Sequence, residues 1–209
     1  MIRHVLFDLD CTLYSVRSGL EEKVAERMWQ YVASYLGVSP EGAAAERKKG
    51  IGRYGTTLEW LMAEKGFTDI EDYMKKIHPE DEADCLSADP ELRKFLEGLP
   101  YPCSVLTNAP LFHAERIIGK LGLEGVFKNV FAIEGNGYKG KPHASAFYRA
   151  LDAIGHRSEE VLFIDDVRRY VEGYLAIGGK GILLDELDAH RDYTFQRIGR
   201  LYELARFLE

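Results

Sequence analysis

The chain has 209 residues, enough for one domain with an insertion, and its 46% hydrophobic and 29% charged residues are typical of a globular protein. A net charge of −7 without a basic tract disfavours binding to a nucleic acid polymer, because such binding depends on neutralising phosphates. No apolar run reaches the length of a membrane span, and an apolar strand follows Met1 almost directly, so we expect neither a membrane protein nor a cleaved signal peptide. Three widely separated cysteines favour a reducing compartment, and we expect a cytoplasmic protein.

Short apolar runs along the chain predict buried strands, and segments with helical spacing separate the later ones. The strands are expected at 5–9, 104–107, 130–133, 161–164 and 181–184. Strands that alternate with helices are typical of a parallel sheet built from right-handed crossovers. The sequence therefore predicts an α/β fold with a Rossmann-like core, completed by a C-terminal helix over 192–208.

The stretch 15–87 interrupts this alternation, because its apolar spacing is helical and it contains no convincing strand. Ser39 followed by Pro40 is typical of a helix start, and Gly66 of a helix end. We expect helices over 20–36, 41–50, 56–65 and 69–77. An all-helical insertion after the first strand of an α/β core predicts a cap, with a core domain of 1–14 and 88–209 and a cap domain of 15–87.

Polar side chains stand at the carboxyl ends of the predicted strands, where open parallel sheets bind their ligands. The residues are Asp8 and Asp10 after the first strand, Thr107 and Asn108 after the second, Asp165 and Asp166 after the fourth, and Lys141 before the helix near 143. Each one alone is an ordinary turn or cap residue. Together, four carboxylates in one crevice would repel each other without a cation among them, and oxygen ligands favour Mg²⁺.

Lys141 ends a glycine-rich stretch, Gly135-Asn-Gly-Tyr-Lys-Gly-Lys141-Pro142, that resembles a P-loop in its spacing. A P-loop needs Ser or Thr after its lysine to hold Mg²⁺, and Pro142 offers neither a hydroxyl nor an N–H, so we disfavour a nucleoside triphosphatase. A lysine beside a cation is suited to binding a phosphate group. A nearby aspartate can then act as nucleophile, and a carboxylate two residues further along can transfer the proton of the leaving oxygen.

Four segments occur in the order of the motifs of the haloacid dehalogenase superfamily of phosphohydrolases, and the chain resembles that family over its whole length. They are FDLDCTLY (7–14), LTNA (106–109), GKP (140–142) and FIDDV (163–167). The resemblance implies that Asp8 is the nucleophile and Asp10 the general acid and base. It further implies that Thr107, Asn108 and Lys141 bind the phosphate, and that Mg²⁺ is bound by Asp8, the Asp10 carbonyl and Asp165 or Asp166.

Further segments are similar to the pyrimidine 5′-nucleotidase-like branch of that family, namely YGTTL (54–58), IHPEDEADCLSADPEL (77–92), LTNAPLFHAERII (106–118) and GKPHASAFYRAL (140–151). We therefore expect a small phosphate monoester as substrate, with a pyrimidine nucleoside 5′-monophosphate as the first candidate. Tyr54 and Thr56 lie in an expected loop of the cap and are candidates for substrate recognition. The assembly is expected to be a monomer or a homodimer.

The chain departs from the family pattern at Cys11, where Asn, Asp or Gly is frequent, and at Tyr170, where Asn or Asp is common. The Tyr170 change is expected to loosen the loop that carries Asp165. We expect Trp60 in the cap core, and Arg168, Arg169, His113 and His143 at the surface. The histidines lack the spacing of a zinc site, and the neighbouring carboxylates disfavour Cys11 as a nucleophile.

The sequence is also compatible with other functions on the same scaffold. A haloacid dehalogenase uses the same nucleophile but needs neither Asp10 nor Mg²⁺. The presence of Asp10, Asp165 and Asp166 tells against a dehalogenase, and the complete set of catalytic groups disfavours a catalytically silent binding protein, which Tyr170 keeps as an alternative. A phosphomutase is a further alternative.

Overall fold

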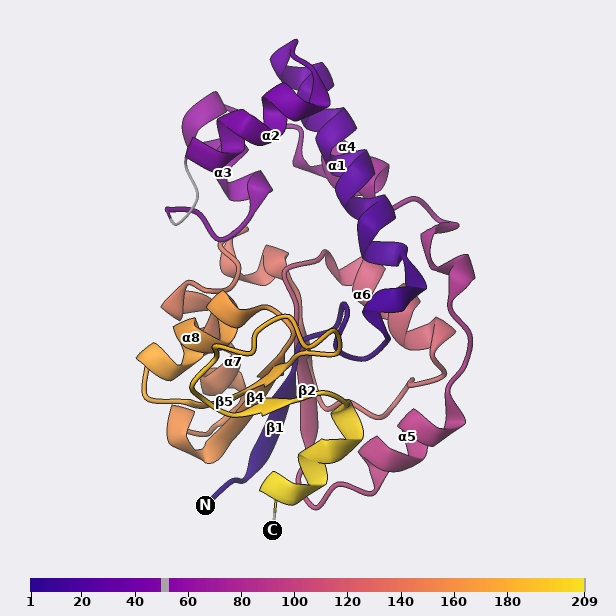
Figure 1. The fold of residues 1–209 in the computed structure, drawn as a ribbon, viewed down its shortest axis with the longest axis vertical. Coiled ribbons are helices and arrows are strands. Elements are labelled where there is room, and N and C mark those ends of the chain that lie inside the picture. Colours follow the sequence, from indigo (N-terminus) through magenta and orange to yellow (C-terminus); the bar gives the residue numbers. More distant parts are fainter. Residues whose placement is uncertain (50–52, 209) are drawn as a thin grey trace.

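The computed structural model describes residues 1–49 and 53–208, and a six-stranded parallel sheet forms its base (Figure 1). The strand order is β3-β2-β1-β4-β5-β6, and every neighbouring pair is parallel. The strands are β1 His4–Phe7, β2 Cys103–Leu106, β3 Val130–Phe131, β4 Val161–Asp165, β5 Lys180–Leu184 and β6 Arg197–Ile198. The five expected strands and the α/β class are thus confirmed, with ends that shift by up to two residues.

Helices cover both faces of this sheet. They are α5 Pro90–Glu97, α6 Leu111–Lys120, α7 Ala144–Ile154 and α8 Arg168–Ala176. Side chains alternate along each strand, so Val5 and Phe7 pack on the α5 and α6 side while Leu6 packs with α7 and α8. Both faces are therefore buried, which explains why the strands appear in the sequence as continuous apolar runs.

The expected C-terminal helix is wrong. The segment instead contains β6 and a 3₁₀ helix, η5, from Leu201 to Phe207. Its apolar residues Leu201, Leu204 and Phe207 are three apart, and all three pack on the main core. A spacing of three suits the 3₁₀ helix, whose side chains repeat every three residues.

The described residues from Leu20 to Ile77, between β1 and α5, form a helical segment above the sheet (Figure 1). Its helices are α1 Leu20–Leu36, α2 Pro40–Lys49, α3 Thr57–Lys65 and α4 Ile70–Ile77, close to their expected positions. An apolar cluster fills this segment and extends to Ile133 of the sheet part, and Trp60 within it is 1% exposed, as the sequence predicted. Within the described residues, none of the helices is long and apolar enough to cross a membrane.

Candidate active site

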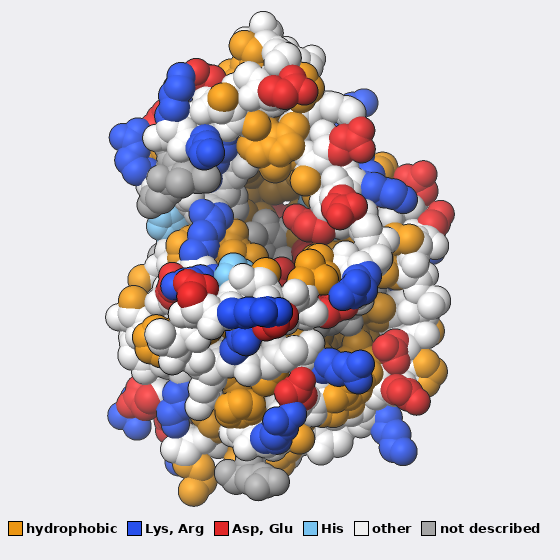
Figure 2. All heavy atoms as spheres, viewed as in Figure 1, with side chains coloured by type: hydrophobic (Ala, Val, Ile, Leu, Met, Phe, Trp, Pro, Cys, Tyr) orange, Lys and Arg blue, Asp and Glu red, His pale blue; other side chains and the backbone are white. Residues whose placement is uncertain are grey.

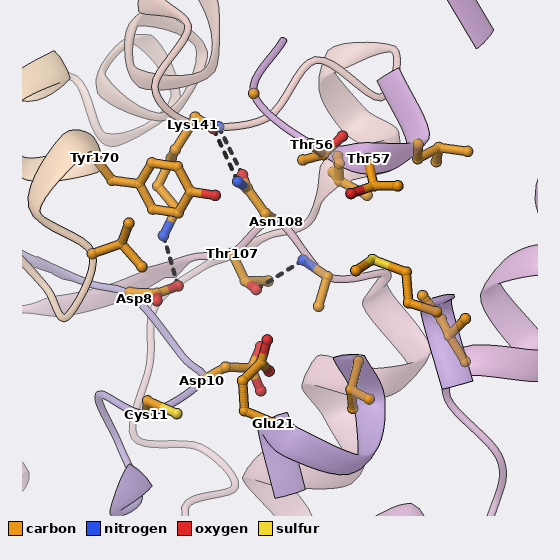
Figure 3. A pocket seen from close by; sticks show the side chains of 18 of the residues that line it. Asp8, Asp10, Cys11, Glu21, Thr56, Thr57, Thr107, Asn108, Lys141 and Tyr170 are labelled. Atoms are coloured by element: carbon orange, nitrogen blue, oxygen red, sulfur yellow. Dashed lines mark hydrogen bonds and ion pairs between the residues drawn. The ribbon is translucent and has the colours of Figure 1, made fainter. Parts of the chain in front are cut away.

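A cavity of about 330 Å³ lies between the helical segment and the carboxyl ends of the strands (Figures 2 and 3). The strand β1 is central and pairs with both β2 and β4, so residues that follow these three strands become neighbours. Residues from both parts of the molecule line the cavity, among them Asp8, Asp10, Glu21, Thr56, Thr107, Asn108, Lys141, Asp166 and Arg169. The sheet thus gathers the residues that the sequence placed at separate strand ends.

Lys141 is the centre of the charged groups in this cavity. Its fully buried Nζ lies 2.6 Å from Asp8 Oδ1 and 2.6 Å from Asp165 Oδ2. Burial acts to lower the pKa of Lys141, but the two carboxylates outweigh it and raise that pKa, so the ammonium group stays charged. The rings of Phe163 and Tyr170 flank the same ammonium, with centroids 5.4 and 5.2 Å away.

Tyr170 therefore contacts the lysine through its ring, and the loop after β4 is held by other groups. Asp165 Oδ1 accepts a hydrogen bond from the Val167 N–H at 2.7 Å, while its second oxygen contacts Lys141. The expected loosening of this loop has no counterpart in the structure, because both oxygens of Asp165 are engaged.

Asn108 holds the backbone of Lys141. Its Oδ1 accepts from the Lys141 N–H at 2.7 Å, and its Nδ2 donates to the Lys141 carbonyl at 3.0 Å. A Cβ on Gly140 would overlap Asn108, which explains the glycine before the lysine. The Asn108 side chain thus fixes the backbone of Lys141 and also lines the cavity. The Thr107 hydroxyl oxygen accepts a hydrogen bond from the Ala109 N–H at 3.0 Å, and the hydroxyl proton remains able to donate.

Three carboxylates beside Lys141 form a group of oxygen atoms that could bind a cation. Oxygens of Asp8, Asp165 and Asp166 lie within 4.8 Å of one another. Burial, followed by the charge of Asp165, raises the pKa of Asp8, and the same two effects raise the pKa of Asp166 to about 8. The single ammonium of Lys141 does not balance three carboxylates, and a hard divalent cation with oxygen ligands fits the set.

Asp10 is held apart from this set. Its Oδ1 accepts hydrogen bonds from Tyr14 OH at 2.8 Å and from His113 Nε2 at 2.7 Å. Burial acts to raise the pKa of Asp10, but His113 and Tyr14 outweigh it, and the pKa lies below its usual range. Asp10 therefore lies outside the group of the other three carboxylates, and its pKa is lowered where those of Asp8 and Asp166 are raised.

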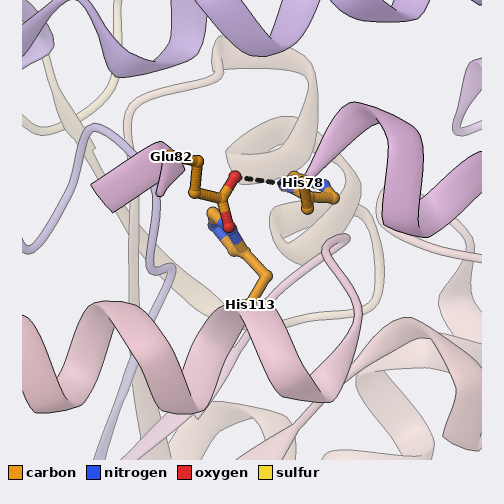
Figure 4. A group of neighbouring side chains, drawn as sticks. All are labelled: His78, Glu82 and His113. Atoms are coloured by element: carbon orange, nitrogen blue, oxygen red, sulfur yellow. Dashed lines mark hydrogen bonds and ion pairs between the residues drawn. The ribbon is translucent and has the colours of Figure 1, made fainter. Parts of the chain in front are cut away.

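His113 is fully buried, so its expected surface position is wrong. Its Nδ1 lies 2.7 Å from Glu82 Oε1, and Glu82 Oε2 lies 2.8 Å from His78 Nδ1 (Figure 4). This arrangement was not visible in the sequence, because the 3₁₀ helix η2 (Glu82–Cys85) covers the start of α6 only in the folded chain. Its one local signal is the spacing of four between His78 and Glu82.

Gly55 of the helical segment lies against the loop that carries Lys141 and against α8. A Cβ there would lie 2.8 Å from the Lys141 carbonyl oxygen, and Arg169 Nη2 donates to the Gly55 carbonyl at 2.6 Å. Arg169 is thus half-buried against the cavity and not a solvated surface charge. His143, which is one-third exposed, lies 2.8 Å from Glu59 of α3 and so also joins the two parts.

The two residues expected to recognise substrate lie differently. Thr56 lines the cavity and caps α3, because its hydroxyl accepts from the Glu59 N–H. The Tyr54 hydroxyl donates to Glu64 at 2.9 Å, and its side chain is not among those that line the cavity. Arg47, which the sequence did not single out, is 6% exposed and lines the cavity beside Thr56.

The backbone at Cys11 has a φ of +55°, and its thiol is buried. Cys11 therefore adopts a left-handed conformation that Asn, Asp and Gly adopt most readily. Burial and the nearby carboxylates raise the pKa of the thiol, so Cys11 stays protonated.

The chain also resembles solved structures over nearly its full length. It is similar to a HAD phosphatase from Thermococcus onnurineus, with 19% identity, a TM-score of 0.67 and coverage of 99% of this chain and 98% of that one. It is similar to the putative HAD hydrolase YfnB from Bacillus subtilis bound to magnesium, with 18% identity, a TM-score of 0.63 and coverage of 99% and 98%. An L-2-haloacid dehalogenase from Xanthobacter autotrophicus, with chloropropionic acid covalently bound, matches at 16% identity and a TM-score of 0.62, with 100% of both chains covered.

At these identities the solved structures show a shared fold alone. The family is shown by the sequence, because a family model described as haloacid dehalogenase-like hydrolase matches residues 2–169. This match includes the carboxylates, the threonine, the asparagine and the lysine of the cavity. The protein is an enzyme of the haloacid dehalogenase-like hydrolases.

Proposed function

We propose that the protein is a Mg²⁺-dependent phosphomonoesterase that forms an aspartyl-phosphate on Asp8. The observation that carries this proposal is the division of the cavity's carboxylates into two environments. Asp8, Asp165 and Asp166 surround a position suited to a cation, whereas Asp10 is held separately by Tyr14 and His113. A nucleophile beside a cation and a second carboxylate for proton transfer are what phosphoester hydrolysis requires.

The phosphate of the substrate would lie between Asp8 and the two donors, Lys141 and the Thr107 hydroxyl. An Asp8 oxygen attacks phosphorus, the bond from phosphorus to the ester oxygen breaks, and Asp10 gives that oxygen its proton. Water then attacks the aspartyl-phosphate, Asp10 takes the proton of the water, and phosphate leaves with Asp8 restored. His113 keeps Asp10 ionised in the free site, and the charge of an incoming phosphate dianion favours the protonated form needed for the first step.

Mg²⁺, held by Asp8, the Asp10 carbonyl and Asp165 or Asp166, would supply positive charge against the phosphate and the carboxylates. This role fits the raised pKa values of Asp8 and Asp166 in the protein without a cation. A dehalogenase attacks carbon and needs neither Asp10 as an acid nor a cation, so the two carboxylate environments favour a phosphatase over a dehalogenase.

The helical segment is proposed as a cap of residues 15–87 over a core of 1–14 and 88–209. The cavity volume of about 330 Å³ suits a small phosphorylated metabolite. The helical segment contributes an apolar wall, which includes Met28, Tyr73 and Met74. Such a wall supports a pyrimidine nucleoside 5′-monophosphate as the first substrate to test. The three cysteines are free, which supports a cytoplasmic location.

Phosphate release from nucleotides, sugar phosphates and vitamin phosphates, each with Mg²⁺ and with chelator, tests this function. We expect metal-dependent release that is abolished by Asp8→Asn, because an amide is a poor nucleophile. Release concentrated on pyrimidine nucleotides would support the substrate class. Release that survives Asp8→Asn or chelation would overturn the proposed mechanism.

A further inference from the structure

We propose that His113, oriented by Glu82, is a positioning residue that aims Asp10 for its proton transfers. The proposal rests on the function proposed above, since it concerns the step in which Asp10 gives or takes a proton. It adds two residues outside the four sequence motifs, one in α6 and one in η2, the 3₁₀ helix between α4 and α5.

The bonding of Asp10 is one-sided. Tyr14 and His113 both donate to Oδ1, and in the described part of the chain no hydrogen bond reaches Oδ2. Two donors on one oxygen fix the rotation of the carboxylate, so the second oxygen is left for the substrate. Asp10 lines the cavity with its side chain 20% exposed (Figure 3), whereas His113 is fully buried and is not among the residues that line the cavity.

The contacts of His113 fix its protons as well as its position. Each ring nitrogen lies 2.7 Å from a carboxylate oxygen, Nε2 from Asp10 and Nδ1 from Glu82. An ionised carboxylate only accepts, so both nitrogens must donate. Glu82 therefore prevents the ring from turning and keeps Nε2 as a donor to Asp10, as a buried carboxylate does for a catalytic histidine.

Glu82 is itself held by cations from several elements. Its buried carboxylate contacts Arg116 Nη1 of α6 at 2.5 Å and lies 3.9 Å from Arg27 Nη2 of α1. His78, at the end of α4, hydrogen-bonds to the second oxygen of Glu82 (Figure 4). Arg27 and Arg116 also donate to the carbonyls of Ile77 and Pro79. His113 and Glu82 thus link Asp10 to α1 and to the segment that follows α4.

His78, Glu82 and His113 also lie close enough together to hold a metal ion. Two observations favour positioning over metal binding. Arginines already neutralise Glu82, and His113 uses its second nitrogen for Asp10. A cation placed there would have to displace the hydrogen bonds that the three side chains make with one another.

A matched pair of substitutions separates the two contacts of His113. In His113→Gln the side-chain amide nitrogen takes the place of Nε2 and retains a donor to Asp10. In His113→Asn it takes the place of Nδ1 and retains only the donor to Glu82. His4→Asn is the control for loss of a buried histidine, because His4 bonds Ser104 at 2.9 Å and does not line the cavity.

Turnover is measured with Mg²⁺ on an alkyl phosphate and on p-nitrophenyl phosphate, whose leaving group needs little protonation. For His113→Asn we expect kcat to fall about 100-fold on the alkyl ester and only a few-fold on the aryl ester. His113→Gln should retain more than a tenth of the wild-type kcat on the alkyl ester, and His4→Asn should not change the ratio of the two esters. Equal losses of kcat in His113→Asn and His113→Gln, or equal losses of kcat on both esters, would overturn the proposal. Either result would leave the phosphatase function intact.

A readout that needs no turnover is the ¹⁵N spectrum of the histidine rings in the unliganded wild-type protein. We expect both N–H protons of His113 to be visible, with the Nε2 signal moved by Asp10→Asn and the Nδ1 signal moved by Glu82→Gln. A His113 ring with one unprotonated nitrogen, or signals insensitive to these substitutions, would overturn the proposal even in a protein that hydrolyses no ester. Stoichiometric zinc in the purified protein that is lost in His78→Asn would also overturn it, in favour of a metal site.

Discussion

Removing the Lys141 ammonium should destabilise the protein, because two carboxylates depend on it. Lys141→Met retains the length of the side chain and removes its charge. At 2.6 Å and an effective dielectric constant of about 20, each contact with Asp8 and Asp165 contributes about 6 kcal/mol of attraction. Protonation of a carboxylate relieves much of that loss, and breaking a buried ion pair typically costs about 3–5 kcal/mol. We expect the free energy of unfolding at pH 7 in chelator to fall by that amount.

Mg²⁺ should restore part of this loss, since a divalent cation among the same carboxylates replaces the missing charge. The assay is urea denaturation followed by circular dichroism, once with chelator and once with Mg²⁺. Lys139→Met is the matched control, because Lys139 is exposed and two residues away. It should change the stability by less than about 0.5 kcal/mol.

The reasoning would be refuted by a Lys141→Met protein as stable as wild type in chelator. It would also be refuted by a loss that Mg²⁺ leaves unchanged. Either result would mean that neither Lys141 nor Mg²⁺ balances the charge of these carboxylates.

Without a cation, the stability of the wild-type protein should fall as the pH rises from 7 to 8.5. In the folded protein the pKa of Asp166 is about 8 and that of His113 about 10, so in this window both bind more protons in the folded than in the unfolded state. Each therefore lowers the free energy of unfolding by at most about 1.4 kcal/mol per pH unit. Thermal unfolding across this range checks the sign, and Mg²⁺ should flatten the curve; a rise of stability with pH would contradict it. Gly140→Ala should lower the free energy of unfolding by about 1–3 kcal/mol and impair turnover, since the new methyl group overlaps Asn108. Gly119→Ala in α6, which has room for the methyl group, is the control, and equal effects of both changes would contradict this account.

The strand ends were predictable because two properties of the sequence agree there. Buried parallel strands appear as apolar runs, and their carboxyl ends must lie along one edge of the sheet. Asp8 and Thr107 directly follow β1 and β2, and Asp165 is the last residue of β4. These three strands are adjacent, so no further information was needed to bring the residues together.

The surroundings of Asp10 were not predictable, because they depend on contacts between distant segments. His113 looks like a polar residue at a helix start, and only the packing of η2 on α6 buries it against Glu82. Likewise, Arg169 appears to be a surface charge until the loop at Gly55 lies against it. The C-terminal segment was mispredicted for another reason, since apolar residues three apart suit a 3₁₀ helix as well as an α-helix.

The position of Lys141 explains why a lysine and not an arginine serves there. An ammonium group donates in three tetrahedral directions, and Asp8 and Asp165 accept two of its protons. Under the proposed function the third proton would donate to a phosphate oxygen, so the same nitrogen would contact Asp8, Asp165 and the substrate at once. A planar guanidinium spreads its protons in a single plane and cannot serve three partners arranged around one point. Exchange for arginine would therefore preserve the charge of the site and lose its stereochemistry.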